Sequence, residues 1–273
     1  MNHFMNNLLT FCLLVSFATA LSGQVTPVPK VGDAGMAIGI SDVDLIDKMM
    51  ATMPGFGNTR DRLQQQTVKQ FMMPVRTVGL RGDDLSYSIA SCLEFYVNLN
   101  KNYKVNLSPD YISLSIKSQG KSVNFKEAFQ FLVHNGTVSA AILPYDASAI
   151  TSAVYATQKF KVSNYLHIFR ELTSGRQRVF EARKALMRGN PVLIEVNAGP
   201  GIKSQQGNKY IELKGGTQKY PLVIVGFDEI KEAFEVMSCW GNSWGNGGYG
   251  WITYDDFSKY AANGYVFVPE QSY

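Results

Sequence analysis

The chain has 273 residues, of which 45% are hydrophobic and 18% charged, an ordinary globular composition that can bury a full core in one domain of two lobes. Its 26 Lys and Arg residues against 22 Asp and Glu residues give a net charge of +4, without a basic run or an interleaved aromatic stripe. This pattern argues against nucleic acid as a partner.

The first predicted element is a secretory signal peptide at residues 1–23. The apolar run from Leu8 to Ala20 is too short for a comfortable membrane span, and the polar Gln24 follows it. The seven residues before the run contain no Lys or Arg, so an uncleaved membrane anchor is the alternative. No later run is long and apolar enough to span a bilayer, so we expect a secreted or periplasmic protein with no membrane contact after cleavage.

Removal of the signal would leave two cysteines, Cys92 and Cys239, and two histidines, His134 and His167. In an oxidising compartment the two thiols could pair or could both stay free, and the sequence leaves both possibilities open. No cluster of His, Cys and carboxylate residues has the spacing of metal ligands, so we expect no metal and no cofactor.

Residues 24–68 are predicted to form an N-terminal extension. A capping-box start at residues 41–44 predicts a helix through about Met53, before a Pro-Gly-Phe-Gly break. A propeptide is one interpretation. The simpler one is an extension that packs on the domain or wraps it.

The next stretch, residues 75–94, predicts a tight turn followed by a long helix. Gly79 and Gly82 flank the turn, and Asp83 is a good N-cap for a helix that begins there or at Asp84. The apolar residues that follow recur at helical spacing. A helix N-terminus presented at a turn stabilises an anion or lowers the pKa of a thiol placed there.

The remaining elements change from helices to strands along the chain. Caps at Ser108 and Asn124 predict helices through about Leu114 and up to Asn135, and a third helix is expected over residues 177–187. Strands are expected over residues 192–196, 220–227, 233–238, 250–254 and 264–268. This order predicts an α+β fold.

Two motifs resemble those of the papain-like cysteine peptidases. Residues 78–84, closed by Leu93-Glu94, resemble the Gln-Gly-x-Cys-Gly-Ser-Cys run that opens a long helix, and residues 240–249 resemble the Asn-Ser-Trp-Gly motif with its later glycines and tyrosine. The resemblance implies a domain over residues 69–270. Its N-terminal helical lobe would span about residues 69–160, and its C-terminal antiparallel β-rich lobe about residues 161–270.

The resemblance also places the four catalytic positions of the family. Val78 falls on the oxyanion glutamine, Asp84 on the nucleophilic cysteine, Tyr220 on the basic histidine and Ser238 on the orienting asparagine. A carboxylate is a poor nucleophile for acyl transfer, and a tyrosine hydroxyl with a pKa of about 10 stays protonated at neutral pH. All four substitutions together predict that the peptidase chemistry is lost.

The resemblance implies a peptide-binding groove as well. Gly82 stands at its turn, and Ser122 and Val123 fall where the family has a Gly-Gly pair that binds an extended peptide. The Val123 side chain is expected to narrow this groove. A peptide or a protein remains the expected class of partner.

Three functions are therefore open. The preferred interpretation is a secreted, catalytically inactive homologue that acts as a binding or structural protein. The second is an active papain-family cysteine peptidase that uses Cys239 as the nucleophile of a rearranged site. The third gives Asp84 and Tyr220 an acid-base role on another substrate.

Other candidate groups are explained without catalysis. Cys92 lies on the apolar face of its predicted helix, and neither His134 nor His167 falls on the position of the base. The G-x-S-x-G pattern at residues 241–245 lacks the strand-turn-helix setting of a nucleophile elbow. The Asp83-Asp84 pair is interpreted as helix capping rather than as an acidic dyad.

Overall fold

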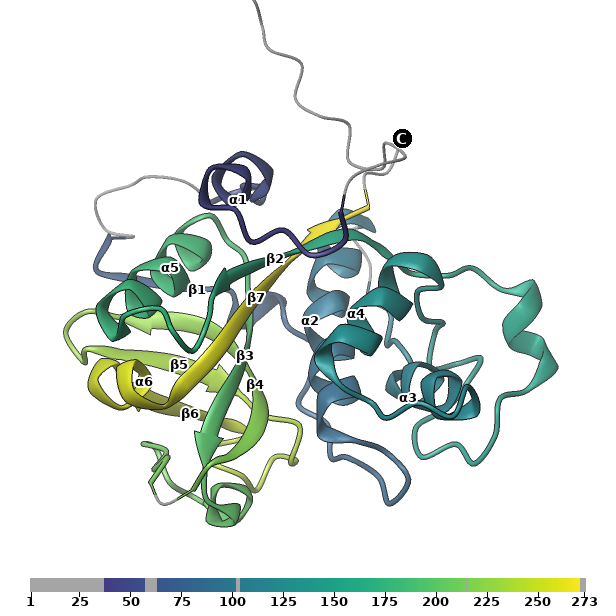
Figure 1. The fold of residues 1–273 in the computed structure, drawn as a ribbon. Helices are drawn as coiled ribbons and strands as arrows, with labels where there is room; N and C mark the ends of the chain where they lie inside the picture. The colour runs from purple at the N-terminus through teal and green to yellow at the C-terminus, as the bar shows by residue number, and fades with distance from the viewer. Residues whose placement is uncertain (1–36, 57–62, 102–103, 215, 271–273) are drawn as a thin grey trace, which may run out of the picture. The chain divides into compact units, whose positions relative to one another are not determined.

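A computed structural model describes residues 37–56, 63–101, 104–214 and 216–270 (Figure 1). The predicted signal peptide lies outside these ranges. The helices are α1 (Val43–Met49), α2 (Asp84–Lys101), α3 (Pro109–Ser118), α4 (Phe125–His134), α5 (Gly175–Met187) and α6 (Tyr254–Tyr260), with short 3-10 helices η2 (Lys69–Phe71), η3 (Ser152–Ala156) and η4 (Pro200–Ser204). The strands are β1 (Gln65–Thr67), β2 (Val162–Phe169), β3 (Val192–Ala198), β4 (Gln218–Asp228), β5 (Ala233–Met237), β6 (Tyr249–Thr253) and β7 (Ala261–Pro269).

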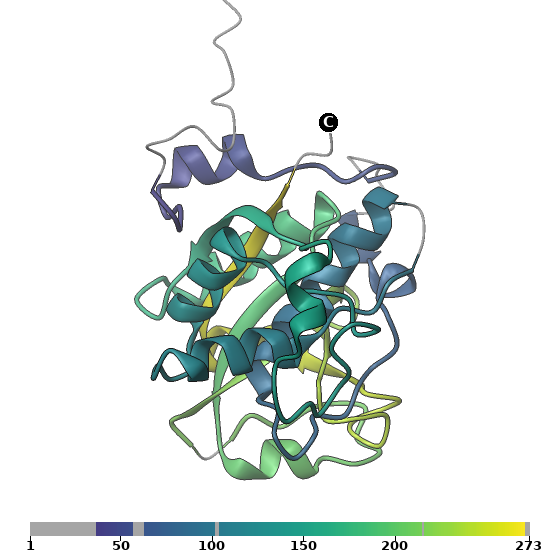
Figure 2. The same ribbon diagram turned by 90° about the vertical axis from the view of Figure 1, so that its right-hand side faces the viewer.

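The strands form one antiparallel sheet. Its order is β2-β7-β3-β4-β5-β6, and β1 pairs with the end of β4. The pairing of β3 with β4 is regular from Val192 opposite Ile224 to Ala198 opposite Gln218. Helices α2, α3 and α4 lie together on one side of the sheet, as Figures 1 and 2 show from two directions. The α+β prediction with a helical part and an antiparallel sheet is confirmed.

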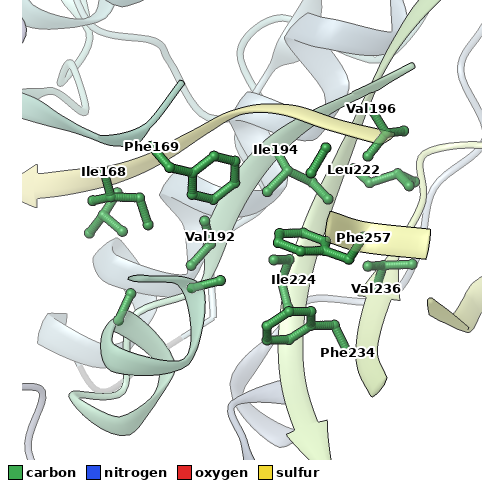
Figure 3. Close-up of a cluster of buried hydrophobic side chains, with 14 of the residues drawn as sticks. Ile168, Phe169, Val192, Ile194, Val196, Leu222, Ile224, Phe234, Val236 and Phe257 are labelled. Atoms are coloured by element: carbon green, nitrogen blue, oxygen red, sulfur yellow. The ribbon is translucent and has the colours of Figure 1, made fainter. Parts of the chain in front are cut away.

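Two hydrophobic cores lie on opposite faces of the sheet because successive strand residues point to opposite sides. Ile194, Leu222 and Ile224 belong to the first core, which packs against α5 and α6 (Figure 3). Their neighbours Leu193 and Val223 belong to the second core, which packs against α2, α3 and α4. The sheet therefore joins both halves of the molecule.

Helix α2 begins the second core. Asp83 caps it, since its Oδ1 atom accepts a hydrogen bond from the Ser86 amide at 2.8 Å. The apolar positions predicted at helical spacing, Ile89, Cys92 and Leu93, are all buried. Ser108 and Asn124 also cap α3 and α4 as predicted, accepting hydrogen bonds from Tyr111 and Glu127.

The segment before α2 packs on α5. Helix α1 lies beside α5 and β2 (Figure 1), and Lys184 of α5 forms an ion pair with Asp47 at 2.8 Å. The buried Asn190 side chain donates a hydrogen bond to the Ala51 carbonyl at 2.7 Å. Strand β1, which also falls in the segment expected as an extension, pairs with β4.

Several predicted boundaries differ from the structure. Helix α1 ends at Met49 rather than near Met53, because the chain turns there to place Met50 and Met53 in the cores. Helix α3 continues beyond Leu114 to Ser118. Strand β2 and helix α6 were not predicted, although β2 alternates between buried and half-buried residues along its length.

Candidate functional site

The N-terminus of α2 lies at the junction of both halves of the fold. The turn before it is closed by a hydrogen bond from the Gly82 amide to the Gly79 carbonyl at 3.2 Å. The preceding residues pair with the segment after β5, since the Val78 amide donates to the Cys239 carbonyl at 2.9 Å and Thr77 bridges Trp240. Gly241 is required here, because a Cβ atom would lie 2.4 Å from the Thr77 hydroxyl.

The side chain of Asp84 forms an ion pair with Lys203 of η4. The ammonium group of Lys203 lies 5.7 Å from the ring centroid of Tyr220 and 5.8 Å from that of Trp240. The structure thus brings the predicted nucleophile and base positions to one lysine. We call these four residues, Asp84, Lys203, Tyr220 and Trp240, the Asp84 cluster.

The Tyr220 ring is fixed by its neighbours on the sheet. It is buried at the start of β4 and meets the Trp240 ring edge-to-face, with centroids 6.1 Å apart. Its hydroxyl donates a hydrogen bond to the Gln218 side-chain oxygen at 2.8 Å. The hydroxyl proton is thus directed to Gln218 rather than to Asp84.

Lys203 was not predicted as a site residue from the sequence, although it completes the Asp84 cluster. Its backbone is held by Ile202, whose carbonyl accepts a hydrogen bond from the Trp244 indole at 2.6 Å. The only sequence signal is the Gly199-Pro200-Gly201 run, which indicates a turn after β3. That signal does not say which side chain the turn directs at the helix.

The alternative nucleophile, Cys239, contacts the backbone of Asp84. Its Sγ atom is 3.5 Å from the Asp84 carbonyl oxygen, to which the thiol donates. Burial raises the pKa of the Cys239 thiol, and the nearby Asp84 carboxylate raises it further. Cys92 and Cys239 are both buried free thiols, which resolves the question of their pairing.

Ser238, at the position of the orienting asparagine, is bonded to its own loop. Its hydroxyl donates to the Gly248 carbonyl at 3.3 Å and accepts from the Trp240 amide at 3.3 Å. Both interactions stabilise the turn between β5 and β6. The serine therefore orients Trp240 rather than Tyr220.

The two histidines of the described ranges lie in other surroundings. His134 is an exposed residue in the last turn of α4. His167 on β2 stacks on Tyr265 with ring centroids 4.5 Å apart, and its Nε2 atom lies 3.0 Å from the Asn263 side-chain oxygen. Burial lowers the pKa of His167.

The groove positions also occupy defined places. Ser122 is exposed and Val123 half-buried, and Val123 packs against the second core. Two residues later, the Phe125 ring stacks on Tyr265 of β7 with centroids 5.1 Å apart. Aromatic side chains from α4 and the sheet thus meet two residues after Val123.

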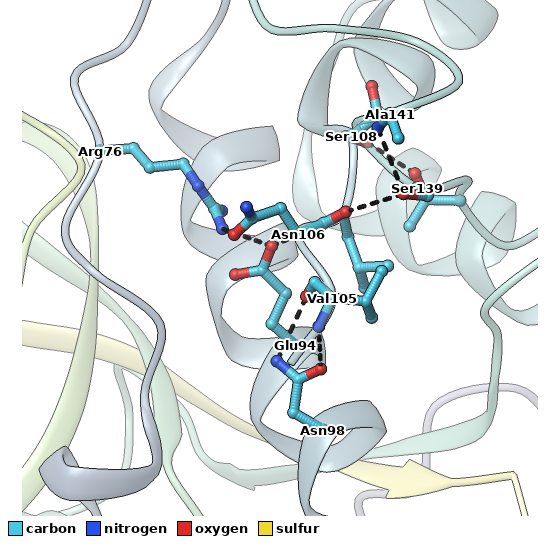
Figure 4. A network of polar contacts seen from close by, with 10 residues as sticks. Arg76, Glu94, Asn98, Val105, Asn106, Ser108, Ser139 and Ala141 are labelled. Carbon is cyan, nitrogen blue, oxygen red and sulfur yellow. Dashed lines mark hydrogen bonds and ion pairs between the residues drawn. The ribbon is translucent and has the colours of Figure 1, made fainter. Parts of the chain in front are cut away.

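A buried ion pair secures the other side of α2. Arg76 contacts Glu94 at 2.5 Å and the Asn106 side-chain oxygen at 3.0 Å, and the Leu107 amide donates to Glu94 (Figure 4). Burial raises the pKa of Glu94 to about 7, although Arg76 opposes this rise. The pair ties the chain before α2 to the segment that follows it.

The G-x-S-x-G pattern and the Asp83-Asp84 pair both have structural settings without catalytic geometry. Ser243 of the G-x-S-x-G pattern lies in an exposed turn that leads into β6 rather than into a helix. Asp83 caps α2, and its second oxygen is buried without a hydrogen-bond partner among the described residues. Within the same ranges, no three His, Cys, Asp or Glu side chains form a group that could hold a metal ion.

Comparison with known proteins finds similar sequences of low identity. A cysteine protease of Blomia tropicalis is 21% identical over 223 residues, which cover 75% of this chain and 66% of that protein. Ananain of Ananas comosus is 23% identical over 202 residues, which cover 71% of this chain and 56% of that protein. The chain therefore spans less than two thirds of the length of both relatives.

Solved structures share the fold. Xylellain, a cysteine protease from Xylella fastidiosa, superposes with a TM-score of 0.61 at 15% identity, covering 86% of this chain and 96% of its own. A cysteine protease of Carica candamarcensis gives 0.60 at 17% identity, covering 76% and 99%. The papain family cysteine protease pattern matches residues 64–269, well over half of the sequence, and this chain therefore belongs to that family.

Proposed function

We propose that this chain is a papain-family homologue that does not hydrolyse peptide bonds and acts as a binding or structural protein. One observation carries the proposal: the side chain at the N-terminus of α2 is a carboxylate, and it forms an ion pair with the Lys203 ammonium group. Papain-type chemistry needs a thiolate beside an imidazole that takes and returns its proton. The Asp84 cluster offers an ammonium and a tyrosine instead.

The surroundings of the Asp84 cluster favour the same proposal. The Val78 amide is engaged by the Cys239 carbonyl, and the Val78 side chain carries no donor for an oxyanion. The Ser238 hydroxyl is engaged within its loop. Each of these groups would need to change partner before it could assist acyl transfer.

The rearranged cysteine peptidase has less support. Its nucleophile would be Cys239, whose burial and raised pKa both oppose formation of a thiolate. His167 is held by Asn263 and Tyr265 on the sheet. The acid-base role for Asp84 and Tyr220 is also disfavoured, because Lys203 pairs with the carboxylate and the tyrosine hydroxyl donates its hydrogen bond to the Gln218 side-chain oxygen.

The test is hydrolysis of a peptide library by the purified protein, beside its Cys239→Ala variant. We expect no turnover above that of a heat-inactivated sample for either protein. Turnover that disappears in Cys239→Ala would overturn the proposal and establish the rearranged peptidase. Turnover that survives in Cys239→Ala but disappears in Asp84→Asn would also overturn the proposal, and it would assign the hydrolysis to Asp84 instead of Cys239.

Secretion belongs to the proposal as well, and it rests on the apolar run at residues 8–20. None of the helices within the described ranges is both long enough and apolar enough to cross a membrane. Sequencing the N-terminus of protein collected from culture medium tests cleavage after about residue 23. An intact Met1 on membrane-bound protein would favour the anchor instead.

A further inference from the structure

The Asp84 cluster has the composition of a binding site for an amine. One ammonium group pairs with a carboxylate and lies over two aromatic rings, Tyr220 and Trp240, at 5.7 and 5.8 Å from their centroids. Proteins hold cationic groups with this combination, because the carboxylate neutralises the charge and the ring quadrupoles attract it. We call Asp84, Tyr220 and Trp240 the cage.

The cage is built independently of Lys203. Asp84 is fixed as the first residue of α2, and Tyr220 is fixed by its hydrogen bond to Gln218. Trp240 lies between Tyr220 and Trp244, with the Trp244 centroid 5.3 Å away. Removal of the lysine side chain would therefore leave the three groups in place.

Lys203 enters the cage from a short, anchored turn. Trp244 holds the carbonyl of Ile202, and Gln205 makes two hydrogen bonds to the Glu212 backbone on the other side. The lysine side chain itself is 45% exposed. Its ammonium group can thus leave for solvent while the backbone of η4 stays fixed.

We propose that the cage is a binding site for a primary ammonium group, that of a lysine side chain in a partner peptide or protein, and that Lys203 occupies it from within the chain. This inference rests on the proposed non-catalytic function and names the chemistry of its ligand. The ligand and Lys203 would use the same three contacts. Binding therefore requires exchange of one ammonium group for the other.

Because Lys203 belongs to the same chain as the cage, it competes strongly with a free amine for the three contacts. A group held by a short linker acts at an effective concentration in the millimolar range, whatever its own affinity for the cage. A free amine must exceed that value to enter the wild-type cage. We expect n-butylammonium, which reproduces the end of a lysine side chain, to bind Lys203→Ala at least ten-fold more tightly than the wild type.

The experiment titrates n-butylammonium into the wild type, Lys203→Ala and Lys203→Ala/Asp84→Asn, with tryptophan fluorescence and calorimetry as readouts. The uncharged 1-butanol is the matched ligand control. Saturable binding of the ammonium but not of the alcohol is expected for Lys203→Ala, with at least a ten-fold loss in the double variant. Circular dichroism spectra of all three proteins establish that each is folded.

Absence of saturable binding to a folded Lys203→Ala variant would overturn the cage. Equal binding of butanol would also overturn it, because the site would then recognise the butyl chain and not the ammonium group. Peptide hydrolysis by the same samples is read separately. Turnover counts against the proposed function whatever the titration gives, and failure to bind the amine counts against the cage alone.

Discussion

Single residues decide the electrostatics on both sides of α2. Asp84 and Glu94 are both carboxylates on this helix, yet their surroundings differ. The Asp84 side chain is 20% exposed and paired with Lys203, whereas Glu94 is fully buried and shares its contacts with Arg76, Asn106 and the Leu107 amide. Burial penalises the charged form of a carboxyl group, so the charge of Glu94 costs free energy in the folded protein.

Glu94 makes stability depend on pH. Its pKa of about 7 in the folded protein lies above the value of about 4.3 for an unfolded chain. The folded state therefore binds the proton more tightly, and this contribution is present below pH 4.3 and lost as pH rises through 7. We expect the free energy of unfolding of the wild type, relative to Glu94→Gln, to fall by at most about 1.4 kcal/mol per pH unit over that range.

Urea denaturation of both proteins at pH 4.5, 5.5, 6.5 and 7.5 measures this difference. Glu127→Gln, which removes a half-buried carboxylate on α4, is the matched control for the substitution itself. If the free energy of unfolding of the wild type, relative to Glu94→Gln, rises with pH instead, the attraction of Arg76 for the Glu94 carboxylate outweighs the cost of burying its charge.

At the scale of elements, the N-terminus of α2 keeps the setting of a reactive group. The turn, the Asp83 cap and the partial positive charge of the helix are present beside the Lys203 ammonium. The side chain at this position, that of Asp84, is a carboxylate instead of a thiol. The same backbone should therefore activate a cysteine introduced at this position.

Asp84→Cys is expected to produce a thiol of lowered pKa. The helix N-terminus and Lys203 both favour the thiolate, whereas burial suppresses it at Cys92 and Cys239. Alkylation by iodoacetamide at pH 7, followed by peptide mapping, should be at least ten-fold faster at residue 84 than at the native thiols. Removing Lys203 in addition should slow it, and an equal rate at all three thiols would contradict the prediction.

The contact of the N-terminal segment with α5 depends on Asn190. Its side chain accepts a hydrogen bond from the Tyr96 hydroxyl at 3.1 Å and donates one to the Ala51 carbonyl. Asn190→Ala would leave the buried Tyr96 hydroxyl and the half-buried Ala51 carbonyl without these partners, so we expect a loss of about 1–3 kcal/mol. Chemical denaturation measures it against Asn208→Ala, an exposed control, and a loss below about 0.5 kcal/mol would contradict it.

Elements with local signals could be predicted from the sequence, and contacts between distant segments could not. Caps at Asp83, Ser108 and Asn124 mark three helices correctly, because a cap satisfies neighbouring backbone amides. Strand β2 was missed because its buried positions include the polar Asn164, which interrupts the apolar-polar alternation of the sequence, and because its partner β7 is far along the chain. Lys203 was missed for the same reason, since its approach to Asp84 depends on Trp244.

At the scale of the molecule, the halves share one core. Phe129 of α4 packs against three aromatic residues of the sheet, Tyr165, Tyr265 and Phe267, with ring centroids between 4.3 and 5.7 Å away. Val223 and Val225 of β4 belong to the same core as Leu93 of α2. A substitution that destabilises one half should therefore destabilise the other half as well.

Phe129→Ala tests this coupling. Removing a fully buried phenylalanine ring leaves a cavity between α4 and the sheet, and we expect a loss of about 3–5 kcal/mol. All three tryptophans, Trp240, Trp244 and Trp251, lie in the sheet half, so their fluorescence follows the sheet while far-ultraviolet circular dichroism is dominated by the helices. Both signals should shift together to lower urea concentration, as in a two-state transition.

Tyr155→Ala is the control, since that ring is 79% exposed. Its loss should change the free energy of unfolding obtained from either signal by less than about 0.5 kcal/mol. If the circular dichroism signal of Phe129→Ala shifts while tryptophan fluorescence does not, the helical half unfolds separately. The Asp84 cluster draws Asp84 from α2 and Lys203, Tyr220 and Trp240 from the sheet half. Separate unfolding would then disperse the cage while the sheet stayed folded, whereas one shared transition keeps it assembled wherever the protein is folded.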